Sequence, residues 1–273
     1  MGIIISMVNN KGGCGKSTAT CNLADALGRA GKKVLVIDMD PQCNSTSILL
    51  PDDFTVQKSL FNILDPFATG SDINELVYTT ECKNVSLIPN IAETAGLESS
   101  IASNSPKSLF RLREDYRHLI ARDFDITIID NPPNIGVFVK CSLNAADFVI
   151  VPIRAGSTFS IEGIIKATKL IKEIRAKGNP ELRFLRLLIN GLDKRTGICR
   201  AVKEHINLAF DKDQVFKTEI PINTGFEMAE SRRETIFQFN SSAKGANAFR
   251  LLAIELIHIL EGQDGREEGQ RAY

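Results

Sequence analysis

Six short apolar runs recur along the 273-residue chain and alternate with helix-forming stretches. The runs cover residues 3–8, 34–37, 85–88, 124–129, 148–153 and 184–189. A strand buried on both faces gives such a continuous apolar run, whereas a strand with one wet face alternates. The pattern therefore predicts an α/β fold, a mostly parallel twisted sheet with helices on both faces. Ligands of such sheets bind at the carboxyl ends of the strands.

The first run leads into a glycine-rich segment with the sequence NNKGGCGKST, residues 9–18. Its end matches the phosphate-loop pattern of P-loop NTPases, but Asn10 stands where that pattern has its first glycine. Backbone amides of the loop, and the positive end of the helix that begins at Lys16, are expected to bind phosphate. Lys16 is predicted to reach the β- and γ-phosphates, Ser17 to bind Mg²⁺ and Thr18 to bind the α-phosphate. The predicted nucleotide-binding residues of the loop are Gly12, Gly13, Cys14, Gly15, Lys16, Ser17 and Thr18.

A second lysine, Lys11, starts on the outer wall of this loop, where ordinary phosphate loops need only small residues. The loop already surrounds the phosphates, so Lys11 cannot easily add a second charge to them from the same chain. We expect its side chain to point away, toward a partner subunit.

Three aspartates follow predicted strands near the loop. Asp38 and Asp40 end the run 34–37, and Asp130 ends the run 124–129 in the manner of a Walker B acid. Carboxylates at this edge of the sheet suit a site that holds Mg²⁺ and an attacking water. An aspartate that merely caps a strand end or a helix is the alternative interpretation.

Together these motifs resemble the ParA/MinD family of deviant Walker A ATPases, and most of all its short ParA/Soj-type members. The family motif K-G-G-x-G-K-S/T corresponds to residues 11–17, and D-x-D-P-Q corresponds to residues 38–42. An Asp followed by two prolines occurs at 130–133, and residues 220–231 match a segment near the nucleotide base. The resemblance covers most of the chain.

The resemblance implies ATP and Mg²⁺ as cofactors, and a homodimer that encloses two ATP molecules. Lys11 would cross to the phosphates of the other subunit, and Lys16 would bind those of its own. Asp40 would position the hydrolytic water, which makes Lys11, Lys16 and Asp40 the catalytic candidates.

For the metal, the resemblance implies that Ser17 binds Mg²⁺ directly, Asp130 binds it through water, and Asp38 supports the magnesium shell. For the base, it points to Pro221. Asn190, at the end of the run 184–189, is a further candidate adenine contact, although the segment Asn-Gly-Leu-Asp lacks the lysine of N-K-x-D and a strand-end turn is the alternative.

Composition predicts one ATPase domain, residues 1–262, with a last helix over about residues 243–260 and a polar tail at 263–273. Six cysteines without C-x-x-C pairs indicate a reduced, cytosolic protein. No apolar run approaches the roughly 20 residues of a membrane span. The partly acidic tail also differs from a basic amphipathic anchor, so we expect no membrane partner and a cytoplasmic, nucleoid-associated location.

Positive charge is concentrated in the middle of the chain although the formal net charge is zero. Residues 154–203 hold twelve basic and four acidic residues, and Lys166, Lys169 and Lys172 are predicted to face solvent. Phosphate binding to nonspecific DNA is one interpretation, and an ordinary solvated helix face is the other. The DNA-binding candidates are Lys194, Arg195, Arg200, Lys203, Arg232 and Arg233. Ile222 and Gly225 are uncharged where DNA-binding relatives often carry arginines.

The hypothesis is a partition ATPase that binds nonspecific DNA as an ATP dimer and is reset by a ParB-like centromere-binding or adaptor protein. Its cargo would be a plasmid or chromosome. The alternatives are positioning of a protein cargo, such as a chemosensory array or microcompartment, a MinD-like division-site regulator, and a biosynthetic ligase. A cluster reductase would need a cysteine soon after Asp130, where the chain has Asn131, Pro132 and Pro133.

Overall fold

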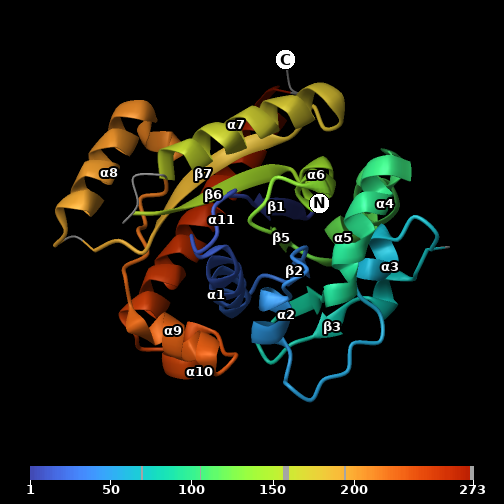
Figure 1. The fold of residues 1–273 in the computed structure, drawn as a ribbon. Helices are drawn as coiled ribbons and strands as arrows, with labels where there is room; N and C mark the ends of the chain where they lie inside the picture. The colour runs from blue at the N-terminus through green and yellow to red at the C-terminus, as the bar shows by residue number, and fades with distance from the viewer. Residues whose placement is uncertain (69, 105, 156–159, 194, 271–273) are drawn as a thin grey trace.

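The computed structural model describes residues 1–68, 70–104, 106–155, 160–193 and 195–270. Seven strands form one sheet in the order β3-β4-β2-β5-β1-β6-β7 (Figure 1). The strands are β1 Ile3–Met7, β2 Val34–Asp38, β3 Tyr78–Thr79, β4 Val85–Ile88, β5 Ile126–Asp130, β6 Phe148–Arg154 and β7 Arg183–Asn190. All neighbouring pairs are parallel except β3 and β4. The predicted α/β fold and its six strands are confirmed, and β3 is an additional short edge strand.

Helices occupy the connections between the strands. They are α1 Lys16–Arg29, α2 Asn44–Leu49, α3 Leu60–Leu64, α4 Leu97–Asn104, α5 Arg117–Asp123, α6 Val137–Ala145, α7 Ser160–Lys177, α8 Gly197–Ala209, α9 Thr224–Ser231, α10 Ile236–Asn240 and α11 Lys244–Gln270. Shorter helical turns cover Ile73–Glu75, Ala92–Gly96, Pro106–Leu109, Leu112–Tyr116 and Lys212–Gln214. The helix α11 continues past its expected end near residue 260, so helical backbone includes most of the predicted tail.

Both faces of the sheet are buried, which explains the continuous apolar runs. Ile4 and Val8 belong to one hydrophobic core, whereas Ile5 and Met7 belong to the other, because successive strand side chains point to opposite faces. The first core includes α3 to α8, and the second includes α1, α10 and α11. Figure 1 shows α1 and α7 on opposite sides of the sheet.

The surface of α7 confirms its predicted orientation. Ile164, Ala167 and Ile171 are buried in the first core, whereas Lys169 and Lys172 are exposed. This is the division expected of an amphipathic helix that lies on a sheet. Among the residues that the structure describes, no helix combines the length and apolar character needed to cross a membrane.

Candidate functional site

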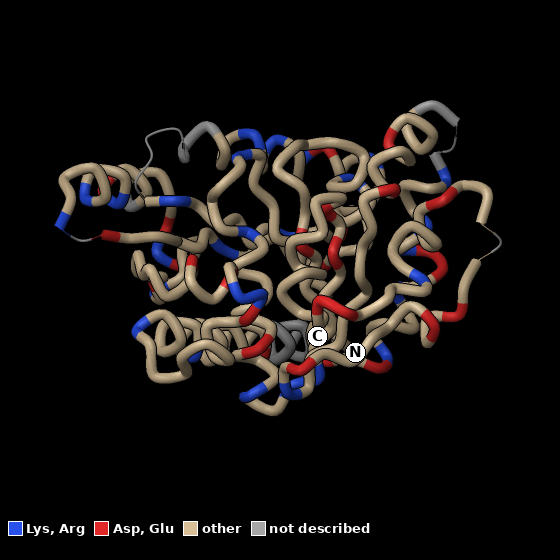
Figure 2. Tube along the Cα trace, turned by 60° about the horizontal axis from the view of Figure 1, so that its bottom comes forward, with Lys and Arg blue, Asp and Glu red and all other residues tan. Residues whose placement is uncertain are grey.

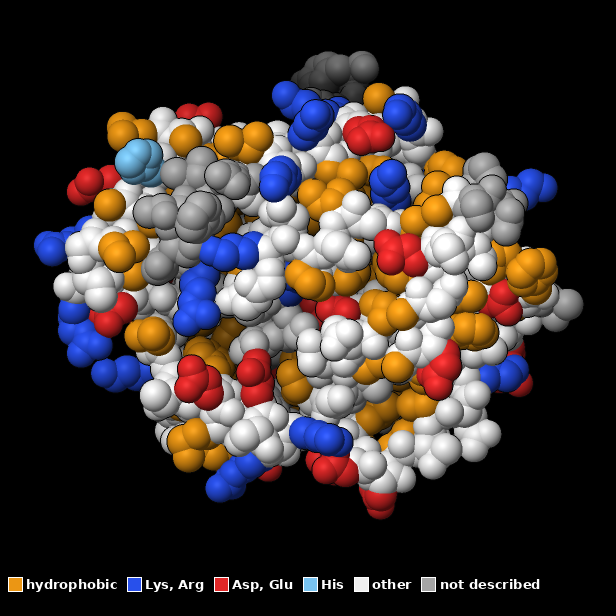
Figure 3. All heavy atoms as spheres, viewed as in Figure 1, with side chains coloured by type: hydrophobic (Ala, Val, Ile, Leu, Met, Phe, Trp, Pro, Cys, Tyr) orange, Lys and Arg blue, Asp and Glu red, His pale blue; other side chains and the backbone are white. Residues whose placement is uncertain are grey.

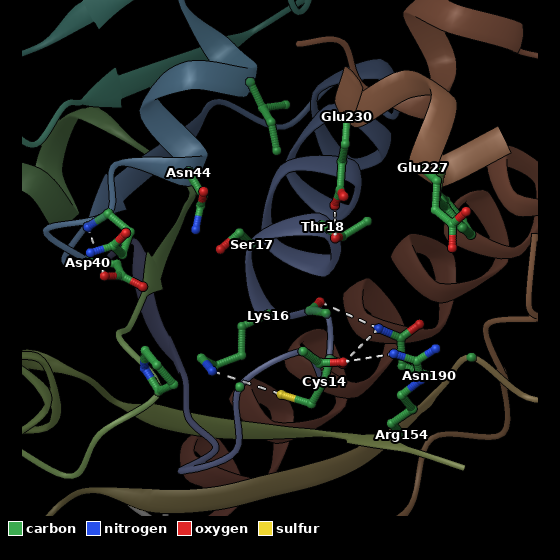
Figure 4. Close-up of a pocket in the computed structure, with 18 of the residues that line it drawn as sticks. Cys14, Lys16, Ser17, Thr18, Asp40, Asn44, Arg154, Asn190, Glu227 and Glu230 are labelled. Atoms are coloured by element: carbon green, nitrogen blue, oxygen red, sulfur yellow. Dashed lines mark hydrogen bonds between the residues drawn. The ribbon is translucent and has the colours of Figure 1, made fainter. Parts of the chain in front are cut away.

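The carboxyl ends of five neighbouring strands, from β2 to the edge strand β7, open onto a cavity of about 580 Å³ (Figure 4). Each strand contributes to its wall directly or through the loop that follows it. The loop after β1 supplies residues 12–18, and the others supply Asp40 after β2, Pro133 after β5, Arg154 in β6 and Asn190 in β7. The helix α9 closes one side with Glu227 and Glu230. The sequence-predicted loop and one predicted acid therefore share one cavity.

Two glycines give the loop its shape. Gly13 and Gly15 have φ angles of 71° and 78°, in the left-handed region that residues with a Cβ rarely adopt. A Cβ on Gly15 would also lie 2.3 Å from Nδ2 of Asn190. Gly15 directly precedes α1, so the loop delivers the chain to the positive end of that helix.

The two lysines of the loop lie in different places. Lys16 is only 7% exposed, and its ammonium donates to the carbonyl oxygen of Lys11 at 3.3 Å and lies 3.9 Å from Sγ of Cys14. Its charge is thus held over the loop, inside the cavity. Lys11 is partly exposed and is not part of the cavity wall, and its backbone amide donates to Oδ1 of Asn9 at 3.0 Å.

Asp38 and Asp130 are neighbours at the ends of β2 and β5, and both are fully buried beneath the cavity. Both oxygens of Asp38 accept hydrogen bonds, Oδ1 from the amide of Asp40 at 3.1 Å and Oδ2 from the amide and hydroxyl of Thr46 at 2.8 and 2.7 Å. Asp130 Oδ2 accepts from the Ser45 hydroxyl at 2.7 Å. Its Oδ1 has no hydrogen-bond partner in the described part of the chain.

These environments make both aspartates harder to ionise than a free carboxyl group. Burial, and then the neighbouring Asp130, raise the pKa of Asp38 to about 8, although the hydrogen bonds from Thr46 lower it. Burial raises the pKa of Asp130 to about 6, while the hydroxyls of Ser17 and Ser45 lower it. A divalent cation would stabilise the ionised forms, and an unpaired buried carboxylate oxygen is a hard ligand of the kind that Mg²⁺ or its water prefers. The residues present therefore fit a magnesium ion.

Asp40 differs from the other two aspartates because it lines the cavity. It is 6% exposed, and its Oδ1 accepts from the backbone amide of Gln42 at 3.0 Å. Figure 4 shows it on the opposite side of the cavity from Glu227 and Glu230. A carboxylate in this position is able to hold a water molecule that faces the phosphate loop.

The base side of the cavity contains both predicted residues, Asn190 and Pro221. The Nδ2 of Asn190 donates to the carbonyl oxygens of Cys14 at 3.1 Å and Gly15 at 3.4 Å, so this amide nitrogen is used to hold the loop. Its Oδ1 is the atom suited to accept from an adenine amino group. The adenine contact stays a prediction.

Two acidic residues and one basic residue of the cavity were not predicted. Thr18 donates its hydroxyl hydrogen bond to Glu230. The Arg154 guanidinium donates to the carbonyl oxygen of Gly13 at 3.3 Å. The signal for Arg154 is its position at the carboxyl end of an apolar run. The signal for Glu230 is weaker: it lies in the segment that resembles the family segment near the nucleotide base. Glu227 lies one helical turn before Glu230 on the same face of α9.

The DNA-binding candidates are divided between two regions, and Lys194 lies outside the described residues. On and just before α8, Arg195 forms a two-pronged ion pair with Asp193, with N–O distances of 2.9 Å, and Lys203 lies 2.5 Å from Glu219. Arg200 is exposed and makes no side-chain hydrogen bond or ion pair with the described chain. Figure 2 shows basic positions along α8, at the left.

The second region is the end of α9. The Arg232 guanidinium lies 5.2 Å from the ring centre of Phe239, and Arg233 forms an ion pair with Asp52 and lines the cavity. Arg233 is thus part of the cavity wall. On the face in Figure 3, basic side chains gather at the left and top, where Figure 1 places α8 and α7.

Comparisons with known proteins extend beyond these motifs. Residues 2–184 match a family model described as an AAA domain. The chain is 30% identical over 256 residues to the sporulation initiation inhibitor protein Soj of Bacillus subtilis, covering 94% of this chain and 98% of that protein. It is 33% identical over 253 residues to the chromosome-partitioning ATPase Soj of Thermus thermophilus, covering 93% and 94%.

A solved structure is similar over the same extent. Cobyrinic acid a,c-diamide synthase from Mycobacterium smegmatis, with bound ADP and magnesium, superposes with a TM-score of 0.80 at 26% identity, covering 96% of both chains. The similarities therefore concern the whole domain and not the phosphate loop alone.

Proposed function

The chain belongs to the ParA/MinD family of P-loop ATPases, and from this membership we propose that it is the ATPase of a DNA partition system. Its reaction is the hydrolysis of ATP to ADP and phosphate with Mg²⁺. In the proposed cycle an ATP-bound homodimer binds nonspecific DNA in the cytoplasm, on the nucleoid. A ParB-like partner then stimulates hydrolysis and releases the dimer. The observation that carries the proposal is the similarity to Soj proteins over nearly the whole of both chains.

In this proposal the cavity residues bind and orient the nucleotide. The loop amides and Lys16 bind the phosphates, and Thr18 exchanges its contact with Glu230 for one with the α-phosphate. Ser17 and Asp130 hold Mg²⁺, which neutralises charge on the phosphates when bound. Asp38 acts beneath them as a support, since the chain already uses both of its oxygens.

The proposed dimer gives Lys11 and Asp40 their roles. Asp40 lines the cavity and orients the water that attacks the γ-phosphate. Lys11 starts outside the cavity wall, so its charge is directed to the phosphates of the second subunit. Assembly of the dimer therefore completes two sites at once.

The proposed DNA surface is built on α8, with the exposed face of α7 beside it in the dimer. Arg200 supplies a charge without an ion-pair partner in the described chain, whereas Arg195 and Lys203 must exchange their carboxylates for DNA phosphates. Arg232 and Arg233 are a secondary part of the proposal, because Arg233 also contributes to the nucleotide cavity.

DNA retention measured with ATP, with ADP and without nucleotide tests the proposal. We expect retention of random-sequence DNA only with ATP and Mg²⁺ at about 0.1 M salt, falling steeply as salt rises. Lys16→Ala is the matched control, because it should lose nucleotide and DNA together. Retention that is equal in all three conditions, or absent from all, would contradict the proposed cycle.

The partner decides between DNA cargo and the related alternatives. A protein cargo such as a chemosensory array would use the same ATPase and the same DNA retention, and only the adaptor would differ. A MinD-like regulator in its ATP-bound state would bind anionic vesicles and would not retain DNA. Co-purification of a small DNA-binding protein that raises ATP turnover supports partition of a plasmid or chromosome.

A second candidate function is a biosynthetic ligase, favoured by the similarity to cobyrinic acid a,c-diamide synthase. Such an enzyme activates a small carboxylate with ATP and transfers it to nitrogen. The test is ATP turnover with a small carboxylate and an amine donor. Turnover that rises with these substrates and does not respond to DNA would support the ligase function and contradict the partition function.

A further inference from the structure

Two neighbouring strands deliver side chains to the same segment of the phosphate loop. Arg154 and Asn190 end β6 and β7 and are paired in register. The Arg154 guanidinium donates to the carbonyl oxygen of Gly13 at 3.3 Å, and the Asn190 amide donates to those of Cys14 at 3.1 Å and Gly15 at 3.4 Å. Three consecutive loop carbonyls are therefore held from the ends of two strands (Figure 4).

These contacts fix the direction of the loop amides. In a trans peptide unit the C=O and the following N–H point in opposite directions. When the carbonyls of residues 13, 14 and 15 point to Arg154 and Asn190, the amide hydrogens of Cys14, Gly15 and Lys16 point away from them. When an amide is already oriented, phosphate binding does not include the entropy cost of ordering it. The two side chains thus prepare the loop for its ligand.

Arg154 also lies beside the position at which the N-K-x-D motif has its lysine. The segment that begins at Asn190 has Gly191 in place of the lysine of N-K-x-D. Gly191 has a φ of 64°, and a Cβ there would lie 3.6 Å from Cγ of Arg154. The stem of Arg154 therefore lies beside Gly191, and its guanidinium provides a cation next to Asn190 from the neighbouring strand.

We propose that Arg154 is a positioning residue for nucleotide binding, which orients the phosphate loop through the carbonyl of Gly13. This role rests only on ATP binding and not on the dimer or DNA steps of the proposed function. Arg154 acts on the loop rather than on one phosphate group, so it supports binding of ATP and ADP equally. Its planar guanidinium suits a fixed carbonyl better than a flexible ammonium does.

Calorimetric titration of Arg154→Ala with ATP and with ADP, both with Mg²⁺, tests this role. A hydrogen bond from a charged donor at an exposed site predicts an affinity loss of about tenfold for both nucleotides. Arg154→Lys should recover part of the loss, since its ammonium still reaches a carbonyl. In steady-state assays we expect KM to rise by about the same factor while kcat stays unchanged.

Arg175→Ala is the matched control, because Arg175 is an exposed arginine on α7 away from the cavity. Thermal unfolding without nucleotide should be the same for all three variants, which shows that they fold. Affinities of Arg154→Ala within about twofold of the unchanged protein would overturn the proposal. So would a loss confined to ATP, which would assign Arg154 to the γ-phosphate. Failure of DNA retention alone would leave the role of Arg154 intact.

Discussion

Lys16 carries a charge in a nearly enclosed position, and within the described chain its ammonium makes polar contacts with one carbonyl and one thiol. Phosphate oxygens would place opposite charge in direct contact with this ammonium. We therefore predict that Lys16→Ala weakens ATP binding by about a hundredfold or more, the cost of losing charged hydrogen bonds. Fluorescence titration with an ATP analogue measures the loss. Lys172→Ala, an exposed lysine of α7, is the control, and tight binding by Lys16→Ala would contradict the site assignment.

Asp38 and Asp130 make the stability of the nucleotide-free protein depend on pH. The pKa of Asp38 is raised to about 8 and that of Asp130 to about 6, from an ordinary 3.8, mainly by burial. The folded state therefore keeps protons that the unfolded chain has already lost. Their contribution to stability is complete below about pH 4 and is lost as the pH rises through 6 and 8.

We accordingly predict that the unfolding temperature without Mg²⁺ or nucleotide falls between pH 5.5 and pH 8.5 by roughly several degrees, since a kcal/mol shifts it by a few degrees in a domain of this size. Asp38→Asn should flatten this dependence, because the carboxyl that titrates highest is gone. A fall as steep in the variant as in the unchanged protein would show that other groups control the pH dependence. Added Mg²⁺ should raise the unfolding temperature most at high pH, where the carboxylates are ionised.

At the scale of elements, burial decides what the sequence can predict. Six strands are predictable because a strand covered on both faces must be apolar throughout. The short strand β3 is not, since only its antiparallel pairing with β4 holds it at the edge. The loop and the aspartates are predictable because they follow strands directly.

The remaining cavity residues depend on packing that no local pattern records. Arg154 reaches the loop only because β6 lies beside β1 in the sheet. Glu230 reaches Thr18 because α10 packs on both α1 and α9. There Asn22 accepts from the amide of Ile236 at 2.7 Å, and Asp25 accepts from the Thr235 hydroxyl at 2.6 Å. These contacts join residues more than two hundred positions apart in the sequence.

The two basic regions make different predictions for DNA binding. We predict that Arg195→Glu together with Arg200→Glu on the α8 side lowers ATP-dependent DNA retention by about tenfold or more and reduces its salt dependence. ATP affinity should not change, because neither residue lines the cavity. Filter binding over a salt series measures both quantities, and Arg122→Glu on α5 is the control.

An arginine-to-glutamate substitution at the end of α9 should affect ATP binding as well as DNA binding. Arg233→Glu would place a negative charge in the nucleotide cavity and beside Asp52, so it should weaken ATP and DNA binding together. If the α8 variants keep full DNA retention while Arg233→Glu loses it at unchanged ATP affinity, the DNA surface lies at α9 and the assignment to α8 is wrong.

At the scale of the whole molecule, the separation of Asp40 from the phosphate-binding parts allows binding and hydrolysis to be uncoupled. Asp40 lines the cavity but makes no hydrogen bond to the phosphate loop in the described chain. We predict that Asp40→Ala binds ATP normally. Its hydrolysis rate should fall by about a hundredfold or more, the usual loss for a water-orienting carboxylate. The protein should therefore accumulate as an ATP-bound dimer, which light scattering after size exclusion would detect.

A second substitution, Lys11→Ala, tests whether Lys11 holds this dimer together. Because Lys11 starts outside the cavity of its own chain, Lys11→Ala should leave ATP binding by the monomer nearly unchanged. Added to Asp40→Ala, it should convert the trapped dimer back to an ATP-bound monomer, since the charge that crosses the interface is missing. A dimer that survives in the double variant would show that Lys11 acts within its own chain. An ATP-bound monomer in Asp40→Ala alone would remove the dimer from the cycle.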